Sequence, residues 1–236
     1  VYMDILRHRK FNRFSVHTKL VIFMTVILLI LGTVLFFIIE YTNPYTIGNL
    51  AGSGKITASL FQSVIARTAG FNSVDISSIR DTSAFLLIIL MFIGGSPGST
   101  AGGIKTTTFG VIAITAISTI RGEQDVVIFK KRIGEEVIKK SISIVFISLT
   151  LIAMVSFILT ITEELTFLDL LFETTSAFAT VGLSRGITSS LSNIGKLIIT
   201  LTMYIGRVGP LTMAFALSKR RGQNKFRYVE GNIIVG

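Results

Sequence analysis

Apolar residues fall into long blocks along the chain, and short polar or glycine-rich segments separate these blocks. The first block, Lys19 to Glu40, would reach about 33 Å as a helix at about 1.5 Å per residue. That length covers a hydrocarbon core of about 30 Å. Ile138 to Ile161 predicts a second full span, and a third is expected from Asn193 to Leu217. The spacing therefore indicates a membrane protein.

Shorter helices are expected between these spans. Ile56 to Arg67 and Phe167 to Phe178 are too short to traverse a bilayer, although each can enter one. Thr82 to Gly94 and Thr106 to Ile120 are apolar pieces on either side of a glycine-rich stretch. We expect them to form one interrupted membrane helix.

The same order of elements occurs twice, about 112 residues apart. Each copy has a long apolar helix, a short helix ending in Thr-x-Gly, and a further apolar stretch. The two polar segments read Thr68-Ala69-Gly70-Phe71-Asn72 and Thr180-Val181-Gly182-Leu183. The predicted fold class is an all-α membrane protein with two repeats of transmembrane helix, re-entrant pore loop and transmembrane helix. The second helix of the first repeat is the interrupted one.

Charge sets the orientation and the boundaries. The net charge is +10, and the basic residues gather in three clusters beside apolar blocks. Because basic residues favour the cytoplasmic side, all three clusters are expected there, and nucleic acid is not an expected partner. The expected organisation is a cytoplasmic lead (1–18), the first repeat (19–120), a cytoplasmic linker (121–137), the second repeat (138–218) and a cytoplasmic tail (219–236).

Composition excludes several kinds of site. Half of the residues are apolar, 15% are charged, and the mean hydropathy is +0.71. The absence of cysteine excludes disulfides, thiolate metal sites and cysteine nucleophiles. The two histidines, His8 and His17, have no spacing suited to a metal. We expect no enzymatic activity and no metal centre apart from the transported ion.

The chemistry of Thr-x-Gly suits a filter for a monovalent cation. Glycine reaches φ values that let successive carbonyls face one way, and the threonine hydroxyl adds an oxygen. Such oxygens can replace the water around potassium. One Thr-x-Gly alone is more often a tight turn, but two copies at equivalent places favour the filter. The short helices would point their negative ends, near Ala66 and Phe178, at the ion. Glu163, Glu164 and Asp169 are expected outside, where they would concentrate cations.

The glycine-rich stretch has three interpretations. It consists of Gly94, Gly95, Ser96, Pro97, Gly98, Ser99, Thr100, Ala101, Gly102 and Gly103. It cannot persist as regular helix. An ordinary loop is one interpretation, but the flanking apolar pieces are short for full crossings. A phosphate loop is another, but Ile104 separates the last glycine from Lys105 and no strand precedes it. We favour a flexible gate under the filter, to which Lys105 contributes a hydrogen bond or repels cations.

Arg207 lies near the middle of the last apolar run. Snorkelling to an interface would be strained at that depth, and charged residues within membranes usually face the bundle interior or a wet cavity. We expect Arg207 to face the conduction path and to raise the barrier for cations when the gate is shut.

The combination of these segments resembles the Trk/Ktr/HKT potassium transporters, most closely the third and fourth repeats of the membrane subunit of bacterial Ktr systems. The resemblance covers essentially the whole chain and rests on four segments: 67–72, 94–105, 180–183 and 204–210. It implies that the Thr68 and Thr180 loops form half of a potassium filter. It also implies that the glycine-rich stretch is the intramembrane gating loop and that Arg207 is the arginine beneath the filter.

The same resemblance implies partners and ions. Family members carry four repeats around one pore, form dimers and bind a cytoplasmic ring of nucleotide-binding regulatory subunits. Uptake in Ktr systems depends on sodium, so Na⁺ is an expected activator or coupling ion beside transported K⁺. The tail from Glu230 to Gly236 resembles a C-terminus packed at the dimer interface.

The absence of two repeats is the main departure from the family. This chain alone should not conduct, and a missing N-terminal half or a second chain would complete the pore. A chain that opens at Val1 without Met is expected to be a fragment. Ala69 and Phe71 depart from a strict potassium signature, which implies moderate discrimination against sodium. Three alternatives stay open: a secondary transporter with a midplane site in broken helices, a phosphate-binding module or membrane enzyme, and a non-conducting interaction subunit.

Overall fold

The structure is a computed structural model that describes residues 1, 4, 11–99, 101–209 and 212. The predicted tail, 219–236, lies outside these residues, as does most of the lead. The described helices are η1 Phe11–Arg13, α2 Val16–Glu40, α3 Gly52–Ile65, η2 Ile76–Ser78, α4 Asp81–Phe92, α5 Thr106–Ile120, α6 Glu135–Thr162, α7 Phe167–Ala179 and α8 Asn193–Val208. Strands β1 Val127–Ile128 and β2 Lys131–Arg132 complete the described secondary structure.

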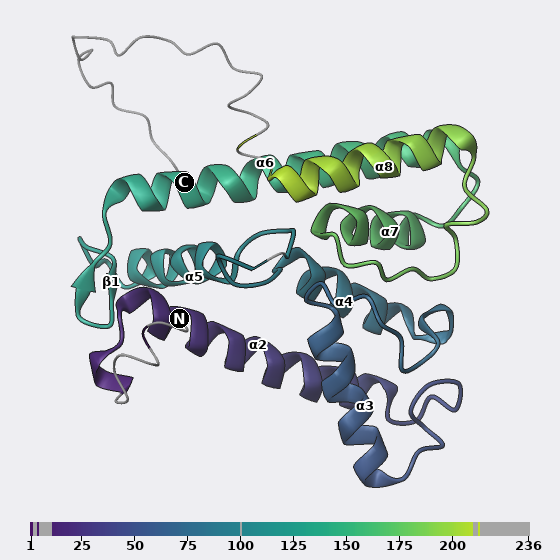
Figure 1. Cartoon of the computed structure of the whole chain (residues 1–236), viewed down its shortest axis with the longest axis horizontal. Helices are drawn as coiled ribbons and strands as arrows, with labels where there is room; N and C mark the ends of the chain where they lie inside the picture. The colour runs from purple at the N-terminus through teal and green to yellow at the C-terminus, as the bar shows by residue number, and fades with distance from the viewer. Residues whose placement is uncertain (2–3, 5–10, 100, 210–211, 213–236) are drawn as a thin grey trace.

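The helices pack in two groups that share a central layer. Helix α2 contacts α3, α4 and α5, whereas α7 contacts α4, α6 and α8. In Figure 1, α6 and α8 run along one side and α2 along the other, with α4, α5 and α7 between them. The contact between α4 and α7 joins the two halves, so the short helix of the second half packs on a helix of the first.

Among the described residues, two helices are long and apolar enough to cross a membrane, judged by length and composition. They are α2, with 25 residues, and α6, with 28. Helices α4 and α5 are shorter, with 12 and 15 residues, and the segment 93–105 separates them. The two long helices contain the first two spans expected from the sequence.

Most of the C-terminal part of the expected third span, up to Leu217, lies outside the described residues. Within the described residues, helix α8 ends at Val208. Gly209 caps it with a φ of 96°, and the next residue in the sequence is Pro210. Glycine in a left-handed conformation followed by proline is a common helix stop, because proline cannot extend the hydrogen-bond ladder. Arg207 therefore lies in the last turn of a helix and not in its middle.

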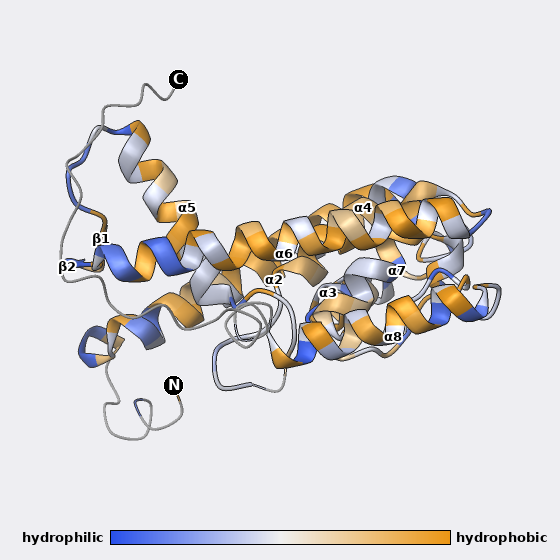
Figure 2. Cartoon of the chain, turned by 90° about the horizontal axis from the view of Figure 1, so that it is seen from above, coloured by the Kyte–Doolittle hydropathy of each residue, from blue (hydrophilic) through white to orange (hydrophobic). Residues whose placement is uncertain are grey.

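Large apolar side chains are exposed on the long helices, and several polar side chains are buried. Large apolar residues of α2 and α6 are exposed, for example Ile38 at 63% and Phe146 at 69%. Figure 2 shows apolar colouring along the middle of α2, α4 and α6, with hydrophilic residues near the β1–β2 hairpin. Buried polar residues include Gln62, Ser83 and Thr174. This distribution suits a lipid environment, where backbone and polar groups must be satisfied within the protein.

The short helix α7 has defined start and stop signals. Thr166 is its N-cap, and the side-chain Oγ1 accepts a hydrogen bond from the backbone N–H of Asp169. The helix stops at Ala179 because Thr180 adopts a left-handed conformation with a φ of 54°. At about 1.5 Å per residue, α7 covers about 20 Å, too little to cross a bilayer.

A short hairpin departs from the all-α prediction. Val127 pairs with Arg132 and Ile128 with Lys131 in antiparallel register. The two turn residues, Phe129 and Lys130, both have positive φ, at 48° and 64°. That geometry matches a type I′ turn, which normally carries Asn-Gly or a similar pair. The sequence lacks this signal, and the strands have two residues each, so the pattern did not reveal them.

The hairpin is anchored by one apolar side chain. Ile128 is 3% exposed and packs in a cluster with Leu20, Met24 and Val111. The hairpin therefore closes over the ends of α2 and α5. The predicted linker is a folded part of the molecule and not a free connection.

Candidate functional site

The two Thr-x-Gly loops share an unusual backbone conformation. Thr68 and Gly70 have φ values of 77° and 68°, and Thr180 and Gly182 have values of 54° and 90°. A β-branched residue with positive φ is a genuine outlier. Such conformations cost on the order of 1–3 kcal/mol and persist where the surrounding structure imposes them, often at functional sites. Both loops thus hold the same strained pattern.

The two loops lie against each other. A Cβ built on Gly70 would stand 2.5 Å from the carbonyl oxygen of Val181, and one on Gly182 would stand 3.7 Å from the Cα of Gly70. The absence of a side chain at Gly70 is therefore required both by its φ and by the neighbouring carbonyl. Two segments 112 positions apart in sequence form one site.

The flanks of the two loops differ in burial. Val181 and Leu183 are 4% and 1% exposed, and they belong to the central apolar cluster with Ile65 and Ala66 of the first half. In the first loop, Ala69 and Asn72 are exposed, and Phe71 is 69% exposed. The second loop is thus supported from behind by the first half of the chain.

The glycine-rich segment touches the base of the second loop. The backbone N–H of Gly102 donates to Thr180 Oγ1 at 3.1 Å. A Cβ on Gly102 would stand 2.6 Å from the carbonyl oxygen of Ala179. The segment is closed at its neck by a bridge between Ile93 and Ile104. It therefore forms a loop between α4 and α5 that reaches the C-terminal end of α7.

Other predicted gate residues have local roles in this loop. Lys105 Nζ donates to the carbonyl oxygen of Ala101 at 2.5 Å. Ser99 Oγ donates to the carbonyl oxygen of Ser96 at 2.6 Å, and Gly98 has a φ of 82° with open space around it. Pro97 lies between Ser96 and Gly98 in this turn. Gly94 and Gly95 precede the turn, and Gly103 follows it. Thr100 lies outside the described residues.

Arg207 lies close to this loop. Its charge and that of Lys105 are near enough to repel each other. Gly206 beside it is pressed against the carbonyl oxygen of Phe178, so α8 crosses α7 at backbone contact. Arg207 lies in the last turn of α8, where its positive charge interacts favourably with the negative end of the helix dipole.

Two of the expected surface acids have structural partners. Glu163 accepts hydrogen bonds from the Ser192 backbone N–H at 2.9 Å and from its Oγ at 2.5 Å. Both bonds hold the pKa of this carboxyl below its usual range. Asp169 is paired with Arg185 at 2.8 Å. Glu164, the third of these acids, is exposed.

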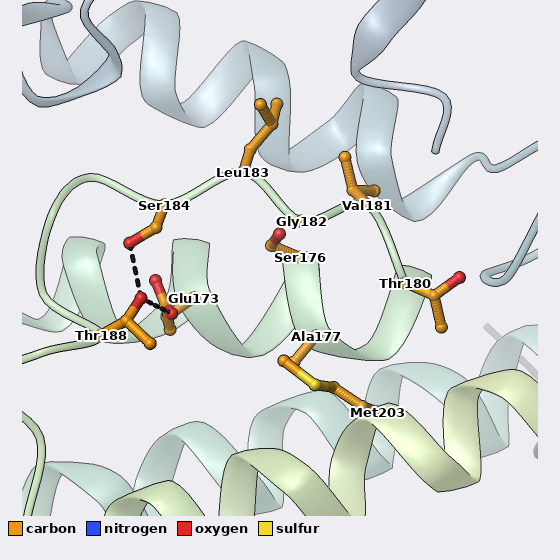
Figure 3. A pocket seen from close by; sticks show the side chains of 10 residues that line it. All are labelled: Glu173, Ser176, Ala177, Thr180, Val181, Gly182, Leu183, Ser184, Thr188 and Met203. Atoms are coloured by element: carbon orange, nitrogen blue, oxygen red, sulfur yellow. Dashed lines mark hydrogen bonds between the residues drawn. The ribbon is translucent and has the colours of Figure 1, made fainter. Parts of the chain in front are cut away.

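Three further residues near the loops were missed by sequence reasoning. Arg185 follows the second loop and also binds Asp81 at the start of α4, at 3.0 Å. Glu40 is fully buried and accepts from Arg80 N–H and Ser83 Oγ at the start of α4. Glu173 on α7 is 5% exposed and lines a cavity of about 370 Å³ beside the second loop (Figure 3). Acidic residues inside apolar segments were the available signal.

Comparison with known proteins identifies the family. The family model described as "TrkH: Cation transport protein" matches residues 6–228. This chain belongs to the TrkH family. The family is one of cation transporters and not of enzymes, so the expectation of a non-enzymatic membrane protein is confirmed, and so is the resemblance to Trk/Ktr/HKT transporters.

Named relatives agree with this assignment. "Ktr system potassium uptake protein B" of Bacillus subtilis is 44% identical over all of this chain and 53% of the relative. The protein of the same name in Vibrio alginolyticus is 41% identical over 99% of this chain and 51% of the relative. "Potassium/sodium uptake protein NtpJ" of Enterococcus hirae is 35% identical over all of this chain and 53% of the relative. The chain therefore spans about half the length of these relatives.

A solved structure shows the same fold. The potassium transporter TrkH from Vibrio parahaemolyticus superposes with a TM-score of 0.72 at 17% sequence identity. The match covers 83% of this chain and 43% of that structure. The TrkH-like helical fold is thus shown by coordinates as well as by sequence.

Proposed function

We propose that this chain supplies two of the four loops of a pore for potassium uptake across the cell membrane. The observation that carries this proposal is the pairing of two loops with the same positive-φ pattern, held in contact through Gly70 and Val181. Oxygen-lined filters need successive carbonyls fixed in one direction, and strained left-handed residues can fix them. The names of the relatives, which specify potassium uptake, support the choice of ion.

The proposed filter consists of Thr68 to Asn72 and Thr180 to Leu183. The exposed side of the first loop, with Phe71 69% exposed, supports a further neighbour there. We assign this neighbour to the other half of the pore. Leu183 occupies the place in the second loop that Phe71 occupies in the first, and Leu183 packs against residues from the first half of the chain. A chain with two loops alone has no closed ring of carbonyls, so no conduction is expected from it.

The proposed gate is the loop between α4 and α5. The hydrogen bond from Gly102 to Thr180 links this loop to the filter, so movement of one would disturb the other. Lys105 and Arg207 add two positive charges near the C-terminal end of α7, which would raise the barrier for a cation. Opening would require both charges to move away from the path.

Orientation and partners complete the proposal. The three basic clusters support a cytoplasmic location for the lead, the linker with its hairpin, and the tail. Dimer formation, a nucleotide-binding regulatory ring and an effect of sodium come from the resemblance, and the potassium/sodium name of the Enterococcus relative supports the last.

The decisive experiment measures ⁸⁶Rb⁺ uptake in a potassium-uptake-deficient bacterial host. This chain would be expressed alone and joined to the first half of the Bacillus subtilis relative, a fusion called here the joined transporter. We expect uptake only from the joined transporter, and its loss in Gly70→Ser and Gly182→Ser variants present at normal amounts in the membrane. Normal uptake by both variants would contradict the filter assignment.

A further inference from the structure

A buried polar side chain follows a Leu-Phe pair on each short helix. Gln62 is the third residue of Leu60-Phe61-Gln62 in α3, and Glu173 is the third of Leu171-Phe172-Glu173 in α7. Gln62 lies just before the end of α3 at Ile65, and Glu173 lies further from the end of α7 at Ala179. Both side chains are buried, at 0% and 5% exposure. Burying such groups costs free energy unless they are hydrogen-bonded, so their position needs an explanation.

Glu173 is hydrogen-bonded to the outer arm of the second loop, the segment from Ser184 to Thr188 that follows Leu183. Thr188 Oγ1 donates to Glu173 Oε1 at 2.5 Å, and the hydroxyls of Thr188 and Ser184 are 2.9 Å apart. Ser184 Oγ in turn accepts from the backbone N–H of Gly186 at 3.1 Å. Figure 3 shows these side chains together on one side of the loop, between it and α7. A continuous chain of hydrogen bonds therefore runs from the short helix to the residue after Leu183.

Gln62 makes the corresponding contact in the first loop. Its Nε2 donates to Ser73 Oγ at 3.4 Å, and Ser73 follows Asn72 directly. This bond is near the upper limit of hydrogen-bond distance, so it is weaker than the one made by Glu173. In each case the remaining polar atom of the side chain, Gln62 Oε1 or Glu173 Oε2, is buried and has no hydrogen-bond partner among the described residues.

The two contacts differ in charge as well as in length. The bond to a carboxylate is charge-assisted and stronger than a bond between neutral groups. Both contacts involve a residue that follows its loop, Thr188 or Ser73, and they hold the end of the loop that is further from the short helix. The strained Thr and Gly residues fix the end that is next to the short helix. Each loop is thus held at two places, and its width depends on both.

We propose that Glu173 and Gln62 are positioning residues that fix the outer arms of the two loops and thereby set the preference for potassium over sodium. This inference rests on the proposed function of the loops as a filter. Glu173 has the larger share, since its hydrogen bond is the shorter of the two. Neither residue touches the ion in this role: each acts through a hydroxyl of the loop.

The test compares the relative uptake of ⁸⁶Rb⁺ and ²²Na⁺ by the joined transporter. Glu173→Leu and Thr188→Val each remove the same hydrogen bond from opposite ends, so each should lower the Rb⁺/Na⁺ preference about tenfold, the factor that corresponds to 1.4 kcal/mol. The double variant should be no worse than either single one, because both act on one bond. Glu173→Gln retains an acceptor oxygen, so it should stay within about threefold of the unmodified protein.

Controls separate positioning from misfolding. Gln62→Leu should have a smaller effect than Glu173→Leu, and Glu123→Gln, in the exposed linker, should have none. The amount of each variant in the membrane is measured beside its uptake. Thr188→Ser, which restores the hydroxyl, keeps the test informative if Glu173→Leu fails to accumulate, because its preference should match that of the unmodified protein.

The possible results distinguish this inference from the proposed function. An unchanged preference in Thr188→Val, with uptake abolished by Gly182→Ser, overturns the positioning role and leaves the filter intact. Equal loss in Glu173→Gln and Glu173→Leu also overturns it, since charge and not the hydrogen bond would then matter. Additive effects in the double variant have the same consequence. Normal uptake by Gly182→Ser would contradict the proposed function of the loops as a filter.

Discussion

The two Thr-x-Gly loops have nearly the same backbone and very different surroundings. Thr68 and Thr180 share positive φ, yet Phe71 is 69% exposed where Leu183 is 1% exposed. The sequence of a loop can impose its own backbone turn, but it cannot choose the residues that pack against it. The shared positive φ values therefore reflect the Thr-x-Gly sequence, and the difference in exposure reflects tertiary packing. The comparison teaches that the second loop is packed against the described part of the chain, whereas the tip of the first loop is exposed.

The largest effect is expected where the two loops touch. Gly70→Ala requires a side chain at a φ of 68° and 2.5 Å from the Val181 oxygen, so both loops must shift. We expect Rb⁺ uptake by the joined transporter to fall at least about tenfold, which corresponds to about 1.4 kcal/mol. Gly52→Ala is the matched control, because a Cβ there meets nothing within 4 Å. Equal uptake by the two variants would show that the loops do not need this contact.

The difference in burial predicts opposite behaviour of two truncations. In this chain alone, purified in detergent, Leu183→Ala should lower the free energy of unfolding by about 2–5 kcal/mol, because it leaves a cavity in the core. Phe71→Ala should change it by less than about 0.5 kcal/mol, as for other exposed positions. Thermal unfolding checks both values.

The joined transporter sharpens this comparison. If another repeat covers Phe71 in the joined transporter, Phe71→Ala should destabilise that protein. The melting temperature of the variant transporter should then fall, as it does for Leu183→Ala. A Phe71→Ala variant that stays neutral in the joined transporter would argue against a neighbour on that side of the first loop.

A smaller effect is expected from the bond between gate and filter. Thr180→Val keeps the shape but removes the oxygen that accepts from Gly102, which costs about 1 kcal/mol. Thr68 has no such bond to the glycine-rich segment among the described residues, so Thr68→Val serves as the comparison. Cysteine labelling at Ser99 in the joined transporter should become faster in Thr180→Val than in Thr68→Val. Equal labelling rates would separate the gate from the second loop.

The smallest effect concerns acid stability near the start of α8. The pKa of Glu163 is lowered in the folded state, first by the hydrogen bond from Ser192 Oγ. Its contribution to stability is therefore fully present above the ordinary glutamate pKa, about 4.3, and is lost as pH falls through the lower folded-state value. Glu163→Gln should flatten the fall in melting temperature in that acidic range and lower stability at neutral pH. An unchanged acid profile would show that Ser192 does not hold this carboxylate in solution.

Much of the fold could be predicted from the sequence, because apolar blocks have lengths that the bilayer dictates. The long helices α2 and α6 contain the expected spans, and the short helices α3 and α7 lie near the expected positions. The break after Val208 was not foreseen, because the apolar run continues past Gly209 and hydropathy does not register a glycine with a positive φ. The hairpin at Phe129 and Lys130 was missed because these residues are unusual in a type I′ turn.

The candidate site was only partly visible in the sequence. Thr-x-Gly identified the loops, because glycine and threonine are residue types with specific backbone and oxygen chemistry. Glu173 was visible only as an acid within an apolar segment, and Gln62 and Arg185 gave no pattern, since the roles of these residues depend on partners elsewhere in the chain. A hydrogen bond between distant residues leaves no spacing to read.

The sequence by itself determined the apolar spans, the duplicated loops and their glycines, because bilayer thickness and backbone sterics act locally on each segment. Only the tertiary structure decided that Gly70 meets Val181, that Gly102 reaches Thr180 and that Leu183 is buried while Phe71 is not. Those contacts join segments from two halves of the chain, and packing in three dimensions selects them.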